Sequence, residues 1–146
     1  MIFGIGITVP VRDVEKAGAE EMWQKLLYIA VAGACGTLAR YGLAGLVQRV
    51  AGIGFPWGTV SVNALGCLLF GLVWTLTSER FPGTGEMRLI LLTGFMGAFT
   101  TFSTFVAESG HLLADGEYLY GLGNILLQNG VGLALFFLGM ALGRLI

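Results

Sequence analysis

Residues 89–113 read LILLTGFMGAFTTFSTFVAESGHLL, an apolar segment of the length needed to cross a membrane, for which about 20 residues suffice. The middle of this segment departs from a plain lipid-facing helix, because it combines small residues with hydroxyl side chains: Gly94, Gly97, Ala98, Thr100, Thr101, Ser103 and Thr104. Hydroxyl groups can hydrogen-bond nearby backbone, so this helix is expected to open locally near Gly97 to Thr100. A helix that breaks at membrane depth is tolerated only beside protein or a water-filled cavity, and its freed carbonyls are typical ion ligands.

The composition of the whole chain agrees with a membrane protein. Of its 146 residues, 55% are hydrophobic and only 12% are charged, and the mean hydropathy is +0.81. A soluble domain carries about twice that share of charge. The net charge is −1 and the eight Lys and Arg residues are scattered, which argues against a nucleic-acid partner. The sequence therefore predicts an all-α integral membrane protein, which places it in the lipid bilayer of the cell (inner) membrane as a multi-pass protein.

Four spans are predicted, at about residues 26–47, 57–76, 89–113 and 120–142. The polar, turn-rich residues 78–88 connect the second span to the third, and a short loop at 114–117 connects the third to the fourth. Residues 1–21 are apolar for only nine residues before they become charged, so they are neither a signal peptide nor a span. We predict one membrane domain, residues 22–146, preceded by an extension of residues 1–21.

Small residues recur at helical spacing in the first span, at Gly33, Gly36, Gly42 and Gly45. Such residues let helices approach closely. Four short helices can hardly enclose a solvated path alone, so a homo-oligomer, most simply a homodimer, is expected.

The cationic residues specify the orientation of the chain only weakly. An even number of spans places Lys25, Arg80, Arg88 and Arg144 on one side, against Arg49 and the deeper Arg40. A chain able to insert both ways can form an antiparallel dimer.

Two ionisable side chains within spans are functional candidates, because charge at membrane depth is costly. Arg40 either reaches the far interface or lines a wet vestibule that concentrates anions. Glu108 follows the third span's break and either forms a structural ion pair or lies at the mouth of a path.

Asn63 is the polar exception in the second span. Its amide either bridges two helices or lines an ion path. Thr59 lies one turn earlier on the same face, which favours a polar track.

Phe102 and Phe105 share one face of the third span. An aromatic stripe at this spacing is usually core. Aromatic ring edges are also electropositive, so together with amide and hydroxyl donors they can stabilise a small anion.

Three motifs in order resemble the Fluc-type (CrcB) fluoride channel family: GTLARYGLAG at 36–45, GTVSVNALG at 58–66 and GAFTTFSTF at 97–105, followed by Glu108. The resemblance covers residues 22–146. It implies a passive fluoride-selective channel that exports fluoride and protects the cytoplasm. It also implies an antiparallel dual-topology homodimer with a broken third helix and two pores.

The resemblance implies site residues as well. A structural sodium ion, which is not transported, is bound at the dimer centre by the backbone carbonyls of Gly97 and Thr100. The predicted fluoride path comprises the pore phenylalanines, the pore amide, vestibule positions and nearby donors: Phe102, Phe105, Asn63, Thr59, Arg40, Glu108, Ser103 and Thr104. The fourth span departs from the family, because it carries Leu133, Leu135, Phe136 and Phe137 where members tend to have Ser or Thr facing the pore. Asn129 is expected to supply a compensating donor.

Three other classes of function fit the sequence less well. A small dual-topology exporter of cationic compounds also has about four spans, but proton-coupled export needs an acidic residue in the membrane, typically in the first span, where this chain has Arg40. A purely structural subunit leaves the polar, broken third span unexplained. An enzyme is disfavoured, because no nucleophile is paired with a base.

Overall fold

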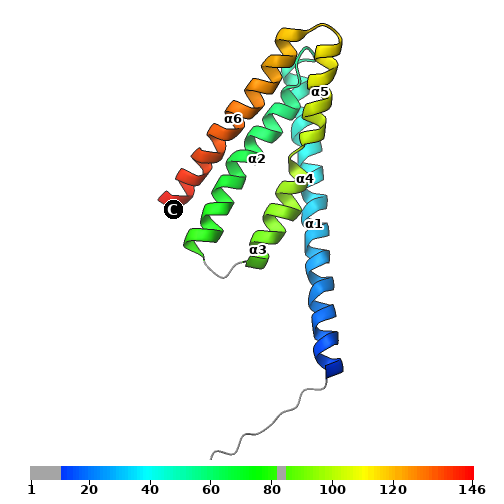
Figure 1. Cartoon of the computed structure of the whole chain (residues 1–146), viewed down its shortest axis with the longest axis vertical. Helices are drawn as coiled ribbons and strands as arrows, with labels where there is room; N and C mark the ends of the chain where they lie inside the picture. The colour runs from blue at the N-terminus through cyan, green and yellow to red at the C-terminus, as the bar shows by residue number, and fades with distance from the viewer. Residues whose placement is uncertain (1–10, 82–84) are drawn as a thin grey trace, which may run out of the picture.

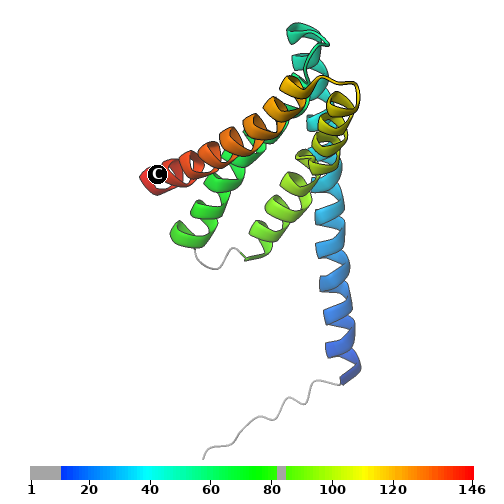
Figure 2. The same cartoon turned by 45° about the horizontal axis from the view of Figure 1, so that its top comes forward.

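The computed structural model describes residues 11–81 and 85–146. Within these ranges, four helical segments are long and apolar enough to cross a membrane: Gly18–Ala51, Trp57–Arg80, Gly85–Ala114 and Tyr118–Leu145. The predicted all-α fold of four membrane-spanning segments is confirmed, and the chain is a multi-pass membrane protein. Figures 1 and 2 show the helices converging at one end of the bundle and spreading apart toward the other.

The first helix is much longer than its predicted span. α1 (Val11–Ala51) has 41 residues, and at 1.5 Å per residue it is about 60 Å long. Its N-terminal part projects beyond the ends of the other helices (Figure 1). Residues 11–21 of the predicted extension therefore continue the first span as one helix, whereas residues 1–10 lie outside the described part of the chain.

One glutamine holds the turn between α1 and α2 (Trp57–Thr75). Gln48 Nε2 donates to the carbonyls of Gly52 and Phe55 at 2.5 and 2.9 Å, and its Oε1 accepts from the N–H of Gly58 at 2.9 Å. Gly52 has a φ of +87°, a conformation that glycine adopts without steric cost. The Gln48 side chain thus satisfies backbone groups at the end of one helix and the start of the next.

The closest helix pair is α2 against α6 (Tyr118–Leu145), which lie side by side in Figures 1 and 2. Glycines permit this approach: a Cβ added to Gly71 would collide with the carbonyl of Phe136, and one added to Gly139 would collide with the carbonyl of Leu68. Backbone atoms cannot move aside as a flexible side chain can, so these two positions require glycine.

Replacing Gly139 with alanine is therefore expected to separate α2 from α6. Overpacking of this kind costs about 1–3 kcal/mol of the free energy of unfolding, and the midpoint of thermal unfolding in detergent should fall. Gly130→Ala is the matched control, because a Cβ at Gly130 meets nothing within 4 Å and alanine favours the helix. Equal midpoints for the two variants would contradict the proposed close packing.

The third span is interrupted, as its composition predicts. It consists of α3 (Gly85–Leu89), the π-helical η2 (Ile90–Met96), α4 (Gly97–Phe99) and α5 (Phe102–Ala114). Thr100 and Thr101, between α4 and α5, have extended backbone with ψ of 160° and 105°. The interruption was predicted near Gly97 to Thr100. The structure places it slightly later, because Gly97 is still helical.

The connection between the second and third spans differs from the prediction, whereas the connection between the third and fourth spans agrees with it. The π-helical η1 (Leu76–Arg80) continues α2, and α3 begins at Gly85, so much of the predicted turn at 78–88 is helical. The loop predicted at 114–117 is confirmed: α5 ends at Ala114, and Gly116, with a φ of +82°, leads into α6.

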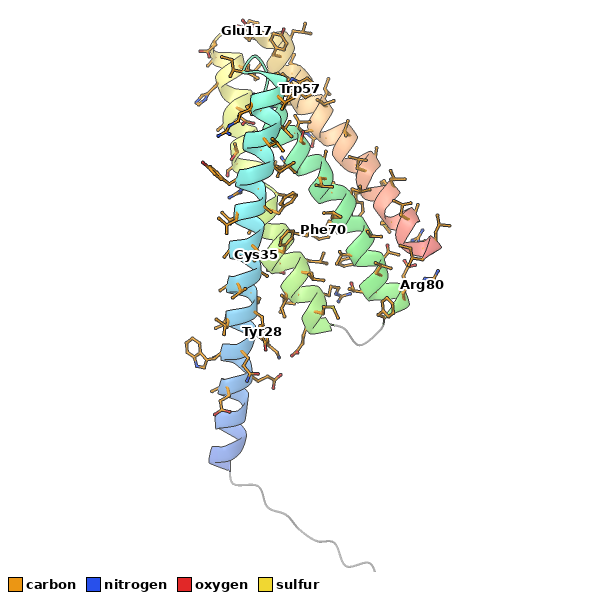
Figure 3. The ribbon with its side chains drawn as sticks, turned by 180° about the vertical axis from the view of Figure 1, so that it is seen from behind. Tyr28, Cys35, Trp57, Phe70, Arg80 and Glu117 are labelled. Atoms are coloured by element: carbon orange, nitrogen blue, oxygen red, sulfur yellow. The ribbon has the colours of Figure 1, made fainter. Side chains whose placement is uncertain are left out.

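Charged side chains tie the spread ends of the helices together. Lys25 on α1 pairs with Glu21 at 2.6 Å and with Glu86 at 2.8 Å, which links α1 to α3. Arg144 on α6 pairs with Glu79 on η1 at 3.3 Å. In Figure 3, Arg80 lies at this end of the bundle and Trp57 and Glu117 lie at the opposite end. Lys25 and Arg144, two of the cationic residues predicted to share one side, thus lie at the spread end with Arg80.

The single chain has a small interior and a large apolar exterior. Its buried apolar side chains are Val60, Val62, Leu92, Met96, Phe99 and Phe105. Many large apolar side chains are exposed on every long helix, Tyr41, Leu38 and Leu126 among them. Such a surface suits lipid and further protein contacts.

Candidate functional site

The interruption of the third span is held open by Asn63 on α2. The N–H of Thr101 donates to Asn63 Oδ1 at 2.8 Å, and Asn63 Nδ2 donates to the carbonyl of Thr101 at 3.1 Å and to Gln128 Oε1 on α6 at 2.7 Å. Both backbone groups of Thr101 are therefore satisfied outside any helix. The bridging role that the sequence left open for Asn63 is confirmed.

Backbone carbonyls are released at the interruption. In an uninterrupted helix the Gly97 carbonyl would accept from the N–H of Thr101, but that N–H is bonded to Asn63. The carbonyl of Thr100 lies just past the helical run and accepts from Arg40 Nη1 at 3.4 Å. Arg40 therefore reaches the interruption in this structure.

Thr101 also begins the next helix. It is the N-cap residue of α5, where its Oγ1 accepts from the N–H of Thr104 at 3.4 Å, and its hydroxyl donates to Thr104 Oγ1 at 2.7 Å. A threonine N-cap satisfies one of the unpaired donors at a helix start. The hydroxyl-rich sequence thus breaks one helix and starts another.

The two phenylalanines of α5 form a pair with different surroundings. The ring centroids of Phe102 and Phe105 are 5.7 Å apart with the planes tilted by 54°. Phe105 is only 7% exposed, whereas Phe102 is 77% exposed in the single chain. One ring is therefore part of the interior and the other is presented outward.

A pocket of about 440 Å³ is lined by Asn63, by the interruption and by the two phenylalanines. It is lined by residues from α2, the interruption, α5 and α6: Asn63, Gly66, Cys67, Phe70, Thr100, Thr101, Phe102, Phe105, Gln128, Asn129, Gly132, Leu133 and Phe136. Figure 3 shows Phe70 on α2 near the level of α4. None of these lining residues is charged, so the pocket offers amides, hydroxyls and ring edges to an ion.

Thr59 and Glu108 form a second polar contact on the same face of α2. The hydroxyl of Thr59 donates to Glu108 Oε1 at 2.7 Å, while Glu108 Oε2 is buried and has no hydrogen-bond partner among the described residues. The structural ion pair considered for Glu108 is absent from the described part of the chain, where its partner is a neutral hydroxyl. Thr59 and Asn63 lie one turn apart on α2, and Asn63 lines the pocket whereas Thr59 does not.

Of the other residues predicted for the fluoride path and the fourth span, only some line the pocket. Ser103 and Thr104 are exposed on α5 and do not line the pocket. Asn129 lines it, although its Nδ2 donates to the carbonyl of Ile125 on its own helix at 2.7 Å. On α6, Leu133 and Phe136 line the pocket, whereas Leu135 and Phe137 do not.

The sequence alone did not single out Gln128, Asn124 and Ser109 as site residues. Gln128 lines the pocket and bonds to Asn63. Asn124 lies one turn before Gln128 on α6 and bonds to it at 2.9 Å. The available signal was the i, i+4 spacing of two amides within an apolar span, which places both on one helix face.

Comparisons with known proteins identify the family of this chain. The sequence profile of the family described as CrcB-like protein, Camphor Resistance (CrcB), matches residues 27–140. A Nitrosococcus oceani protein named fluoride-specific ion channel FluC is 56% identical over 125 residues, 86% of this chain and 100% of the relative. Proteins of the same name from Solidesulfovibrio magneticus and Desulforapulum autotrophicum are 61% and 51% identical over the same shares of both chains. The chain therefore belongs to the CrcB family.

Proposed function

We propose that this chain forms a passive channel selective for fluoride, which exports fluoride from the cytoplasm across the inner membrane and relieves fluoride toxicity. The substrate is suggested by relatives named fluoride-specific ion channels. The observation that carries the proposal is the pocket, where an interrupted membrane-spanning helix faces the Asn63 amide and the two phenylalanine rings. In this proposal the pocket is a path for an ion and not an enzyme site, since the relatives are named ion channels.

The chemistry of the pocket suits a small anion that must pass through. Fluoride that enters the membrane loses hydrogen bonds from water and needs other hydrogen-bond donors in their place. Amide N–H groups and electropositive ring edges supply them without a fixed positive charge. Conduction requires binding that is strong enough for entry and weak enough for exit, and a neutral lining meets both conditions better than a buried cation.

The proposed path extends beyond this pocket. Thr59 and Glu108 lie one turn from Asn63 toward the Trp57 end of α2, and Arg40 lies at the interruption. In the proposal, Thr59 and Arg40 attract and orient the anion at the vestibule, and Ser103 and Thr104 offer donors where two subunits meet.

The functional unit is proposed to be an antiparallel homodimer. The Phe102 ring is 77% exposed and Gly97 is exposed in the single chain, so one side of the path has no protein wall. A second copy with inverted orientation would cover these residues and create two equivalent paths.

A sodium ion is proposed at the centre of that dimer. The released carbonyl of Gly97 and the carbonyl of Thr100 are hard oxygen ligands, which suit Na⁺, and two copies would provide two such pairs. Arg40 occupies one side of the Thr100 carbonyl at 3.4 Å, and a carbonyl oxygen has a second lone pair available. When bound, the ion would hold the two interruptions together and add positive charge near the path. The alternative of an exporter of cationic compounds is not favoured, since the relatives are named fluoride channels.

The proposal is tested by fluoride efflux from liposomes that contain the purified protein. We expect rapid fluoride release and chloride release no faster than from protein-free liposomes. Ion-selective electrodes measure both anions in one preparation. Equal release of the two anions, or release of neither, contradicts the assignment.

A further inference from the structure

A line of hydrogen bonds, partly buried at the pocket and fully buried farther in, runs from the pocket into the protein. Asn63 Nδ2 donates to Gln128 Oε1 at 2.7 Å, and Gln128 Nε2 donates to Asn124 Oδ1 at 2.9 Å. Asn124 Nδ2 then donates to Ser109 Oγ at 2.9 Å, and the Ser109 hydroxyl donates to the carbonyl of Phe105 at 2.8 Å. We call Asn63, Gln128, Asn124 and Ser109 the amide relay.

The direction of the amide relay is fixed at both ends by backbone groups. The Phe105 carbonyl can only accept, so the Ser109 hydroxyl must donate to it, and Ser109 Oγ must accept from Asn124. At the other end, the Thr101 N–H can only donate, so Asn63 must turn its Oδ1 toward it. Each side-chain amide between these ends therefore has one allowed orientation.

Burial makes this direction costly to reverse. Asn124 is completely buried and Ser109 is only 4% exposed, so water cannot replace a lost partner. Turning one amide around would bring N–H groups against N–H groups and oxygens against oxygens. The two inner members of the relay thus hold the two outer members in a single orientation.

This orientation determines what the pocket offers to an ion. The side-chain oxygens of all three amides accept hydrogen bonds within the relay or from Thr101. Asn63 and Gln128 line the pocket, whereas Asn124 and Ser109 do not. Both hydrogens of Asn63 Nδ2 are donated, to the Thr101 carbonyl and to Gln128 Oε1, whereas Gln128 Nε2 donates one of its two to Asn124. The pocket is therefore left with the second N–H of Gln128, which favours an anion over a cation.

We propose that Asn124 and Ser109 are positioning residues that fix the orientation of the Gln128 amide so that it presents an N–H to an anion in the pocket. The inference rests on the proposed function, since it concerns how that site selects the charge of its ion. Asn124 and Ser109 act through Gln128 and do not themselves contact the ion.

The test is a double-mutant cycle on fluoride efflux from liposomes, with Asn124→Leu, Gln128→Met and the double variant. Both substitutions keep the side-chain volume and remove the amide. Each single variant should lower the initial rate on the order of tenfold, since partly satisfied networks lose more than one bond. The double variant should be no slower than Gln128→Met, because Asn124 acts through Gln128.

Several outcomes would overturn the inference. Asn124→Leu at the wild-type rate would show that the relay does not position the site. An equal loss from Asn124→Leu in both backgrounds would show that Asn124 only supports the fold. If the wild-type protein releases no fluoride, the proposed function is contradicted. That result is distinguishable from a failure of this inference, which is read from differences between variants of an active protein.

A second pair of variants covers the case in which Asn124→Leu does not fold. Ser109→Ala removes the hydroxyl that orients Asn124, whereas Ser109→Thr keeps it. We expect slow efflux for the alanine variant and a rate near wild type for the threonine variant, with the same elution volume in size-exclusion chromatography. Equal rates for the two would contradict a positioning role.

Discussion

Phe102→Ile is expected to reduce fluoride efflux to the background of protein-free liposomes while the protein remains folded. Phe102 lines the pocket, and isoleucine keeps the apolar bulk but removes the ring with its electropositive edge. Because Phe102 is 77% exposed in the single chain, the substitution opens no interior cavity in it. A fluoride electrode measures efflux, and size-exclusion chromatography reports the assembly.

The chain provides a matched control in Phe137→Ile. Phe137 is 59% exposed on α6 and also contacts a single neighbouring ring, Phe136, with centroids 5.7 Å apart. It does not line the pocket. The Phe137→Ile control should conduct fluoride as the wild type does. Wild-type flux through the Phe102→Ile variant would show that Phe102 is only a surface ring.

The interruption of the third span was predictable because its cause is local. Small residues and four closely spaced hydroxyls weaken a helix wherever they occur, and Thr101 is a favourable N-cap. Its position was predicted less accurately. Thr101 is the turning point because its N–H meets an amide 38 residues earlier in the chain, and no local pattern carries that information.

The shared face of Thr59 and Asn63 was predictable from helical periodicity, but their partners were not. Thr59 meets Glu108 across 49 residues, and Asn63 meets Gln128 across 65. The ion pair that was one of two alternatives for Glu108 is not found among the described residues for the same reason. Its Oε1 accepts from the Thr59 hydroxyl, a neutral partner that only the tertiary packing identifies.

Long side chains are the hardest to place from sequence. Arg40 can extend several ångströms in any direction from its helix, so its depth in the first span left two options open. The structure directs it to the Thr100 carbonyl. The amide relay was missed because each of its members is common alone, and its significance lies in the order in which donors and acceptors meet.

Asn63→Ala is expected to destabilise the fold and abolish efflux together. The substitution leaves the N–H and the carbonyl of Thr101 and the Oε1 of Gln128 without their partner. Each buried polar group left unpaired costs about 1–3 kcal/mol, so the loss should exceed that of a typical single substitution. The midpoint of thermal unfolding in detergent, followed by tryptophan fluorescence, measures it.

Two further variants separate the role of the Asn63 bridge from that of an amide in general. Asn129→Ala removes an exposed amide whose Nδ2 bonds only within its own helix, so the free energy of unfolding should change by no more than about 0.5 kcal/mol. Asn63→Asp keeps the acceptor for the Thr101 N–H but cannot donate to the Thr101 carbonyl or to Gln128, and it places a carboxylate against these two oxygens. Because charge in a span is costly, its midpoint should fall at least as far as that of Asn63→Ala. If Asn63→Ala unfolds at the wild-type temperature, the interruption does not depend on Asn63. The extended backbone at Thr100 and Thr101 must then be stabilised by the α4 and α5 termini alone.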